Sequence, residues 1–196
     1  MPDNDNYEVL AIKYGGKADR TRAESFIMDD AHDLPHPLDY FIWVIRNDQR
    51  TILVDTGFER TEAAKRNRVV TREPVEALKL IGVDASELQD VIVTHLHYDH
   101  AGTLGDYPRA RFHLQEAEMV YATGPCMCHD ALKLPFTADH VCQMVQHVYA
   151  GRVAYHDGDA EIARSHVPEN NAYRLHASRH PYAVRVLLIL RVKFHG

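Results

Sequence analysis

Residues 95–100 of this chain read His-Leu-His-Tyr-Asp-His and directly follow a run of apolar and β-branched residues at 91–94. Such a run is typical of a strand that is buried on both faces in a layered α/β structure. The residues that follow it therefore form a loop at the carboxyl end of a buried strand. Three imidazoles and one carboxylate on so short a loop are a dense set of metal ligands. We call residues 95–100 the histidine loop.

The spacing within the histidine loop predicts how its ligands are divided between two neighbouring positions for an ion. Side chains at positions i and i+2 of an extended backbone share a face, so His95 and His97 can hold one ion together. Asp99 and His100 follow as the chain turns, and they face a neighbouring position. Because neutral imidazole and carboxylate suit zinc and similar divalent ions, the loop predicts a site for two metal ions. The alternative, a set of solvated surface histidines, leaves unexplained why four ligand residues directly follow a buried strand.

The rest of the pattern predicts strands and helices in alternation along one domain of ordinary size. Predicted strands cover residues 7–14, 40–46, 51–54, 91–94, 111–114 and 152–156. Predicted helices cover residues 74–81, 116–121 and 139–149. Four polar residues separate the second and third strands, which predicts a hairpin that delivers Asp55 to a strand end. Cys142 lies within the apolar pattern of the last helix and is predicted to be a small core residue.

The histidine loop, extended by Ala101 and Gly102, resembles the HxHxDH motif of the metallo-β-lactamase superfamily, in the version seen in N-acyl-homoserine lactonases. Asp55, in the sequence Asp-Thr-Gly, matches that superfamily's habit of placing an aspartate behind the metal loop. Residues 112–115 resemble the lactonase-like branch more than the glyoxalase branch. The resemblance covers residues 7–163. It implies an α+β fold, the four-layer αββα metallo-β-lactamase sandwich.

The resemblance also implies a role for each ligand. His95 and His97 would bind a first zinc ion, and Asp99 and His100 would bind a second. Asp99 would be the catalytic residue as well, orienting the attacking hydroxide and passing its proton to the leaving alkoxide. Asp55 would support a metal-bound imidazole from outside the ligand set. In the family, a histidine from a Gly-His segment, a bridging aspartate and a further histidine complete the two sites.

The chain changes character after residue 163. Residues 1–163 carry a net charge of −11, whereas residues 164–196 carry +5 and contain no glycine before the last residue. The expected Gly-His segment is missing. We therefore predict a metallo-β-lactamase-like domain over residues 1–163 and an atypical basic tail over residues 164–196, with the C-terminal half of the sandwich incomplete. Two interpretations of the tail stay open: a divergent but working ending, in which His176 or His180 reaches the metals, or the translation of a shifted reading frame.

The function implied by the resemblance is that of a zinc-dependent, lactonase-like hydrolase that cleaves an ester or lactone, with N-acyl-homoserine lactones as the substrate class. Two alternatives stay open. A glyoxalase-like enzyme would cleave thioesters. A chain without the C-terminal ligands would hold each ion by about two protein donors, fewer than the three of a catalytic zinc site, and would be a non-catalytic metal-binding remnant.

Composition limits the partners and the compartment. The chain has 22 basic and 28 acidic residues and no basic run in its first 160 positions, so we expect no nucleic-acid partner. Its longest apolar stretch, residues 182–194, is 13 residues long and carries three basic side chains, so we expect no membrane span. The polar N-terminus and the three cysteines predict a cytoplasmic protein without a disulfide framework. The expected partner is a small-molecule substrate, and the sequence does not predict the oligomeric state.

Overall fold

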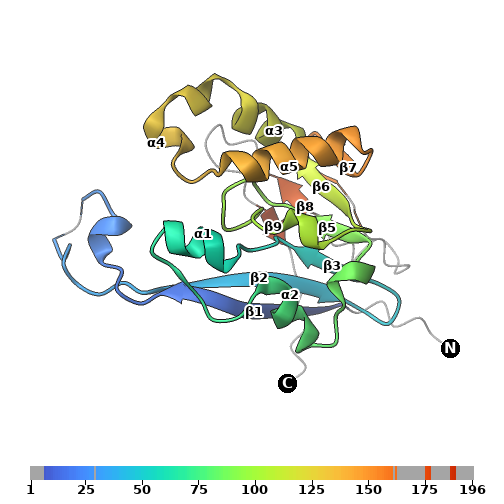
Figure 1. The fold of residues 1–196 in the computed structure, drawn as a ribbon, viewed down its shortest axis with the longest axis horizontal. Helices are drawn as coiled ribbons and strands as arrows, with labels where there is room; N and C mark the ends of the chain where they lie inside the picture. The colour runs from blue at the N-terminus through green and yellow to red at the C-terminus, as the bar shows by residue number, and fades with distance from the viewer. Residues whose placement is uncertain (1–6, 29, 161, 163–174, 178–185, 189–196) are drawn as a thin grey trace.

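The computed structural model describes residues 7–28, 30–160, 162, 175–177 and 186–188. Its main element is a mixed sheet of seven strands with helices packed along it (Figure 1). The strands are β1 (Glu8–Lys17), β2 (Leu38–Arg46), β3 (Thr51–Val54), β4 (Val69–Val70), β5 (Asp90–Ile92), β6 (Arg111–Gln115) and β7 (Val153–His156). Their order across the sheet is β4-β1-β2-β3-β5-β6-β7.

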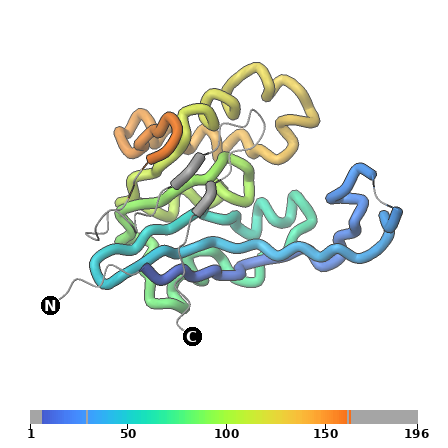
Figure 2. The backbone as a smooth tube through the Cα atoms, turned by 180° about the vertical axis from the view of Figure 1, so that it is seen from behind, coloured from blue at the N-terminus to red at the C-terminus, as the bar shows by residue number. Residues whose placement is uncertain are grey.

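The sheet has an antiparallel half and a parallel half. Strands β4, β1, β2 and β3 pair antiparallel, whereas β3, β5, β6 and β7 run parallel to one another. Figure 2 shows the long β1–β2 hairpin, whose connecting segment projects beyond the sheet. Val54 at the end of β3 pairs with Ile92 at the end of β5. Because these two parallel strands end at the same edge of the sheet, Asp55 lies beside the chain that enters the histidine loop.

In the described part of the chain, five α-helices flank the sheet. They are α1 (Arg60–Lys65), α2 (Pro74–Lys79), α3 (Glu116–Thr123), α4 (Asp130–Lys133) and α5 (Ala138–Tyr149). Figure 1 shows α3, α4 and α5 grouped on one side of the sheet. Short 3-10 turns lie at Arg22–Glu24, Ala85–Glu87, Leu104–Asp106 and Pro125–Cys128. None of the helices in the described part of the chain combines the length and the apolar character that a membrane crossing requires.

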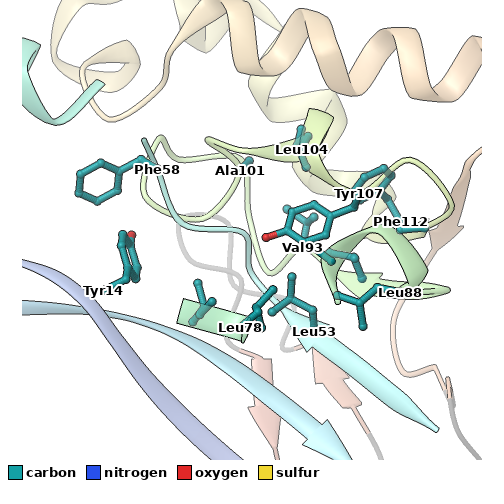
Figure 3. Close-up of a cluster of buried hydrophobic side chains, with 14 of the residues drawn as sticks. Tyr14, Leu53, Phe58, Leu78, Leu88, Val93, Ala101, Leu104, Tyr107 and Phe112 are labelled. Atoms are coloured by element: carbon teal, nitrogen blue, oxygen red, sulfur yellow. The ribbon is translucent and has the colours of Figure 1, made fainter. Parts of the chain in front are cut away.

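Apolar side chains are buried on both faces of the central strands. The main cluster contains Leu53 of β3 and Phe112 of β6 together with Leu78 of α2, and Figure 3 shows part of it. A smaller cluster on the opposite face contains Ile52 and Val54 of β3 and Ile92 of β5. Val91 of β5 belongs to the main cluster and Ile92 to the smaller one, so the structure confirms the prediction that the strand before the histidine loop is buried on both of its faces.

Most predicted elements are confirmed. Strand β3 coincides with the predicted strand 51–54, and α2, α3 and α5 begin and end within two residues of the predicted helices. Strand β5 ends at Ile92, two residues earlier than predicted. The reason is that the N–H of Thr94 donates to Oδ1 of Asp55 at 2.8 Å instead of continuing the ladder with a neighbouring strand.

The prediction for Cys142 is wrong. The cysteine is exposed, because the buried face of α5 consists of His140, Val141 and Met144. Helix α1 is an element that the apolar pattern did not indicate. Its buried residues are only Glu62 and Ala63, so it carries no apolar stripe of helical spacing.

Two short strands of the C-terminal region pair with each other. Strands β8 (Leu175–Ala177) and β9 (Val186–Leu188) are antiparallel, and His176 of β8 lies opposite Leu187 of β9. The side chain of His176 and the whole of His180 lie outside the described residues. The division of the chain at residue 163, and the role of either histidine, therefore stay predictions.

Candidate metal centre

Asp55 connects the end of β3 to the start of the histidine loop. The residue is buried and has a φ of 62°, in the left-handed region that few residues other than glycine, asparagine and aspartate enter. Its N–H donates to the carbonyl of Ile92 at 2.8 Å. Its Oδ1 accepts from the N–H of Thr94 at 2.8 Å, and its Oδ2 accepts from the hydroxyl of Thr94 at 3.0 Å. Asp55 therefore fixes the residue that immediately precedes the loop.

The same carboxylate and hydroxyl orient two of the imidazoles. Oδ2 of Asp55 accepts from Nδ1 of His100 at 2.7 Å. The hydroxyl of Thr94 lies 2.9 Å from Nδ1 of His95. Because that hydroxyl gives its single hydrogen to Asp55, Nδ1 of His95 has to be the donor. Nε2 of His95 then keeps a free lone pair, the arrangement in which a histidine binds a metal.

The predicted ligands lie close together. The ring centroid of His95 is 4.4 Å from that of His97 and 3.8 Å from that of His100. Nε2 of His100 lies 3.4 Å from Oδ2 of Asp99. The structure therefore brings His95, His97, Asp99 and His100 together, each from the loop that the sequence singles out.

The pKa values of these four side chains are shifted in ways that leave two of them neutral and two of them charged. Burial lowers the pKa of His95 to about 3, and the neighbouring His100 and His97 act in the same direction. Burial also lowers the pKa of His97. For His100 burial is outweighed by the carboxylates of Asp55 and Asp99, which raise its pKa to about 10. His100 in turn lowers the pKa of Asp99 against the effect of burial. At neutral pH two neutral imidazoles thus lie beside an ion pair.

The backbone beneath the loop is closely packed. The N–H and the hydroxyl of Thr56 donate to the carbonyl of His100 at 2.8 and 3.1 Å. The N–H of Gly102 donates to the carbonyl of Gly57 at 2.8 Å. A Cβ atom on Gly102 would lie 2.6 Å from the carbonyl oxygens of both Gly57 and Tyr98. Only glycine fits there, so the Asp-Thr-Gly turn and the histidine loop are packed as one unit.

Two residues that the sequence did not indicate also hold the loop. Oε1 of Glu118, a buried carboxylate of α3, accepts from the N–H of Leu96 at 2.8 Å. Burial raises the pKa of Glu118. The hydroxyl of Tyr14 donates to the carbonyl of Asp99 at 3.3 Å. These contacts join positions 22 and 85 residues apart, and no local sequence pattern reports such pairs.

The donor set fits a metal ion in its chemistry. It offers imidazole nitrogens and a carboxylate, and hydrogen bonds on Nδ1 of His95 and of His100 leave Nε2 of each ring as the ligand atom. Within the described ranges, no group of three or more His, Cys, Asp or Glu side chains is placed so that it could hold a metal ion. The loop is therefore a partial donor set.

A second histidine pair lies away from the loop. Nδ1 of His113 is 3.0 Å from Nε2 of His156, and Nε2 of His113 is 3.0 Å from Oδ1 of Asp90. The ring centroids are 5.3 Å apart and the rings are within 14° of parallel. The nitrogens therefore face each other along a nearly straight line, which favours a hydrogen bond over two lone pairs converging on an ion. His113 and His156 therefore pack against each other as a hydrogen-bonded pair.

Comparison with known proteins identifies the family. The family model described as the metallo-beta-lactamase superfamily matches residues 37–189. The chain belongs to the metallo-β-lactamase superfamily. The matched range extends into the basic tail.

Among relatives of this metallo-β-lactamase superfamily chain is the N-acyl homoserine lactonase AttM of Rhizobium johnstonii, 41% identical over 51 residues, which are 26% of this chain and 19% of that protein. A quorum-quenching N-acyl homoserine lactone lactonase has a similar structure, with a TM-score of 0.61 and 20% identity over 79% of this chain and 59% of the other. The dizinc quorum-quenching lactonase AidC, bound to a product, has a TM-score of 0.52 and 15% identity, with coverages of 82% and 60%.

These structural neighbours confirm the predicted fold class. The chain spans less than two thirds of the length of these relatives. Its own activity is accordingly a proposal.

Proposed function

We propose that this chain is a zinc-dependent hydrolase that opens a lactone or cleaves an ester, with N-acyl homoserine lactones as the substrate class. The observation that carries the proposal is the convergence of His95, His97, Asp99 and His100 in front of the buried carboxylate of Asp55. The lactonase relatives support the substrate class. The dizinc lactonase AidC supports the metal.

In this proposal His95 and His97 hold one ion, and Asp99 and His100 hold the second. Zinc supplies the Lewis acidity that polarises a carbonyl oxygen and lowers the pKa of water. His95 and His97 are neutral at neutral pH because burial lowers their pKa values, so they need not lose a proton before binding a metal. His100 has to lose one proton, and it keeps the other on Nδ1 for Asp55.

Asp99 carries the proton in the proposed reaction. His100 lowers the pKa of its carboxyl group, so Asp99 is ionised at neutral pH and can accept a proton from attacking water. The carboxyl group then returns that proton to the alkoxide that leaves when the ring opens. The net reaction adds one water to the lactone and gives a hydroxy acid.

The test follows lactone opening by the release of acid. We expect the zinc-loaded chain to hydrolyse N-hexanoyl-homoserine lactone, and we expect a chelator to abolish the reaction. Asp99→Asn should reduce kcat by about a hundredfold or more, the usual contribution of a positioned acid–base group. His156→Gln is the matched control, because it replaces a histidine outside the loop and should leave the rate unchanged. Activity on thioesters without activity on lactones would identify the glyoxalase-like alternative.

A second candidate function rests on the incomplete donor set. Four ligands divided over two ions leave each with about two protein donors, fewer than the three of a catalytic zinc site. The chain would then be a non-catalytic metal-binding remnant. Zinc content after dialysis separates the two: two tightly held ions per chain contradict the remnant, and less than one ion without lactone opening contradicts the hydrolase.

The remaining partner assignments stay predictions. A small molecule is the proposed substrate, and net charge and composition predict neither a nucleic-acid nor a membrane partner. The cytoplasm stays the predicted compartment.

A further inference from the structure

A short segment after α4 contacts the centre of the histidine loop. Residues 134–137 connect α4 to α5. The ring of Phe136 meets the ring of His97 edge-on, with centroids 4.7 Å apart and planes at 87°. The N–H of Tyr98 donates to the carbonyl of Pro135 at 2.9 Å. This segment, which we call the 134–137 segment, thus touches two consecutive loop residues.

Arg66, at the end of α1, holds the 134–137 segment in place. Its Nη1 donates to the carbonyl of Leu134 at 2.9 Å. Its Nη2 donates to the carbonyl of Phe136 at 3.1 Å and to the hydroxyl of Thr137 at 3.0 Å. The guanidinium also lies over the ring of Tyr98, 4.0 Å from its centroid. One side chain therefore contacts both the segment and the loop that the segment touches.

Glu62 fixes the direction of the guanidinium. Its Oε1 accepts from Nε of Arg66 at 2.6 Å and from the hydroxyl of Thr137 at 2.6 Å. The side chain of Glu62 is 2% exposed and that of Arg66 is 20% exposed. A buried ion pair of this kind requires good geometry, because removing one partner leaves an uncompensated charge. The pair therefore holds the guanidinium of Arg66 toward the 134–137 segment.

We propose that Arg66 is a positioning residue of the histidine loop, which orients His97 through Phe136 and Tyr98 through Pro135. The inference rests on the proposed function in so far as the loop is taken to bind metal. A lysine cannot replace Arg66, because one ammonium cannot reach a carboxylate, two carbonyls and a hydroxyl in the fixed directions of a guanidinium fork. Arg66 touches neither substrate nor ion in this proposal, and it acts only through its neighbours.

The chain offers a matched control in Arg152. Nη2 of Arg152 donates to the carbonyls of Tyr107 and Ala110, and its guanidinium lies 5.3 Å from the ring centroid of Phe112. It is a half-buried arginine with carbonyl acceptors and an aromatic neighbour, like Arg66, but it has no described contact with the histidine loop. Arg152→Lys therefore reproduces the structural cost of losing such a side chain.

The experiment compares Arg66→Lys with Arg152→Lys by two measurements. The first is amide hydrogen exchange of Tyr98 in the metal-free protein, which needs no metal site. The second is the affinity for Co²⁺, read from its visible absorption. We expect Arg66→Lys to exchange the Tyr98 amide at least about tenfold faster and to bind Co²⁺ about 10- to 100-fold more weakly, as substitutions behind metal ligands do. Arg152→Lys should change neither beyond its general loss of stability.

Each outcome decides one question. Equal Tyr98 exchange in the two variants overturns the positioning role. If the wild-type chain binds no Co²⁺, the proposed metal site fails, and faster Tyr98 exchange in Arg66→Lys alone still supports the positioning role.

If Arg66→Lys does not fold, Phe136→Leu is the second variant. We expect it to weaken Co²⁺ binding without changing the Glu62–Arg66 pair. Unchanged Co²⁺ affinity in Phe136→Leu contradicts the route from Arg66 to His97.

Discussion

Oδ2 of Asp55 lies 2.7 Å from Nδ1 of His100, across 45 residues of sequence. The contact exists because β3 and β5 are parallel and end together, so that a residue after one strand faces a loop after the other. It keeps the imidazole of His100 positively charged at neutral pH, since Asp55 and Asp99 together raise the pKa of His100 to about 10.

Asp55→Asn should lower the pKa of His100 from about 10 toward its usual 6.5. Because the pKa of His100 is raised, its interaction with Asp55 stabilises the metal-free fold fully below pH 6.5. This stabilisation is lost as the pH rises through 10. We expect the variant to lose on the order of 2 kcal/mol at pH 6, and less at pH 10. Histidine NMR titration and urea unfolding at both pH values measure the two effects. Asp90→Asn, which removes the carboxylate beside His113, is the control and should leave the titration of His100 unchanged.

Metal affinity should depend on pH because His100 has to lose a proton to become a ligand. We expect the affinity of the wild-type chain for the ion that Asp99 and His100 would hold to rise about tenfold per pH unit between pH 6.5 and 9, with one proton released when that ion binds. Calorimetry in buffers of different ionisation enthalpy counts that proton. A flat affinity over this range would exclude His100 as a ligand.

Gly102→Ala should be strongly destabilising, because the new Cβ would lie 2.6 Å from two backbone carbonyl oxygens that cannot move aside. We expect a loss of about 3 kcal/mol or more in the free energy of unfolding. Gly82→Ala separates sterics from backbone strain: Gly82 has a φ of +74°, and a Cβ placed on it would meet no heavy atom within 4 Å, so its cost should be about 1–2 kcal/mol. Equal losses in the two variants would show that the close approach at Gly102 carries no cost of its own.

Glu118→Gln should keep the fold, since an amide oxygen can accept the same hydrogen bond from the N–H of Leu96. Glu118→Ala leaves that N–H without its acceptor and should cost about 1–3 kcal/mol. Burial raises the pKa of Glu118, so the ionised carboxylate destabilises the fold. This destabilisation develops as the pH rises through the raised pKa. We therefore expect Glu118→Gln to gain stability relative to the wild type between pH 4 and pH 7. A loss over this interval would contradict the raised pKa.

Removal of residues 164–196 tests the predicted tail. If the tail is foreign to the domain, we expect the shortened chain to retain its zinc and to be no less soluble. Loss of zinc, reproduced by His176→Ala or His180→Ala alone, would show instead that the ending is a working part of the site.

Local patterns predict the ligands and much of the sheet. Strand β3 and the grouping of His95, His97, Asp99 and His100 follow from alternation and spacing within a few residues. The position of Asp55 behind the loop also agrees with its contact to His100. These features share one property, that the information lies within a single short segment or a recognisable motif.

The supporting contacts cannot be predicted in this way. Glu118 reaches Leu96 and Arg66 reaches Phe136 across 22 and 70 residues, and neither residue belongs to a motif. Three valines share the helix of Cys142, and this pattern predicts a core position for the cysteine. Which residues of α5 are buried depends instead on how the helix packs against the fold, and not on how many apolar residues it contains. The way the helices pack onto the rest of the fold determines both the supporting contacts and the exposure of Cys142. No local sequence pattern records that packing.

The order of residues in the chain also determines when the supports of the histidine loop become available during synthesis. Every contact described above that orients the histidine loop comes from a residue between Tyr14 and Phe136. A ribosome adds all of these residues to the chain before it adds the basic tail, and a domain generally folds as a unit. The four predicted ligands and their described supports are thus all present in the growing chain before the ending is made. Residues 164–196 therefore join a loop whose described supports already stand in the chain.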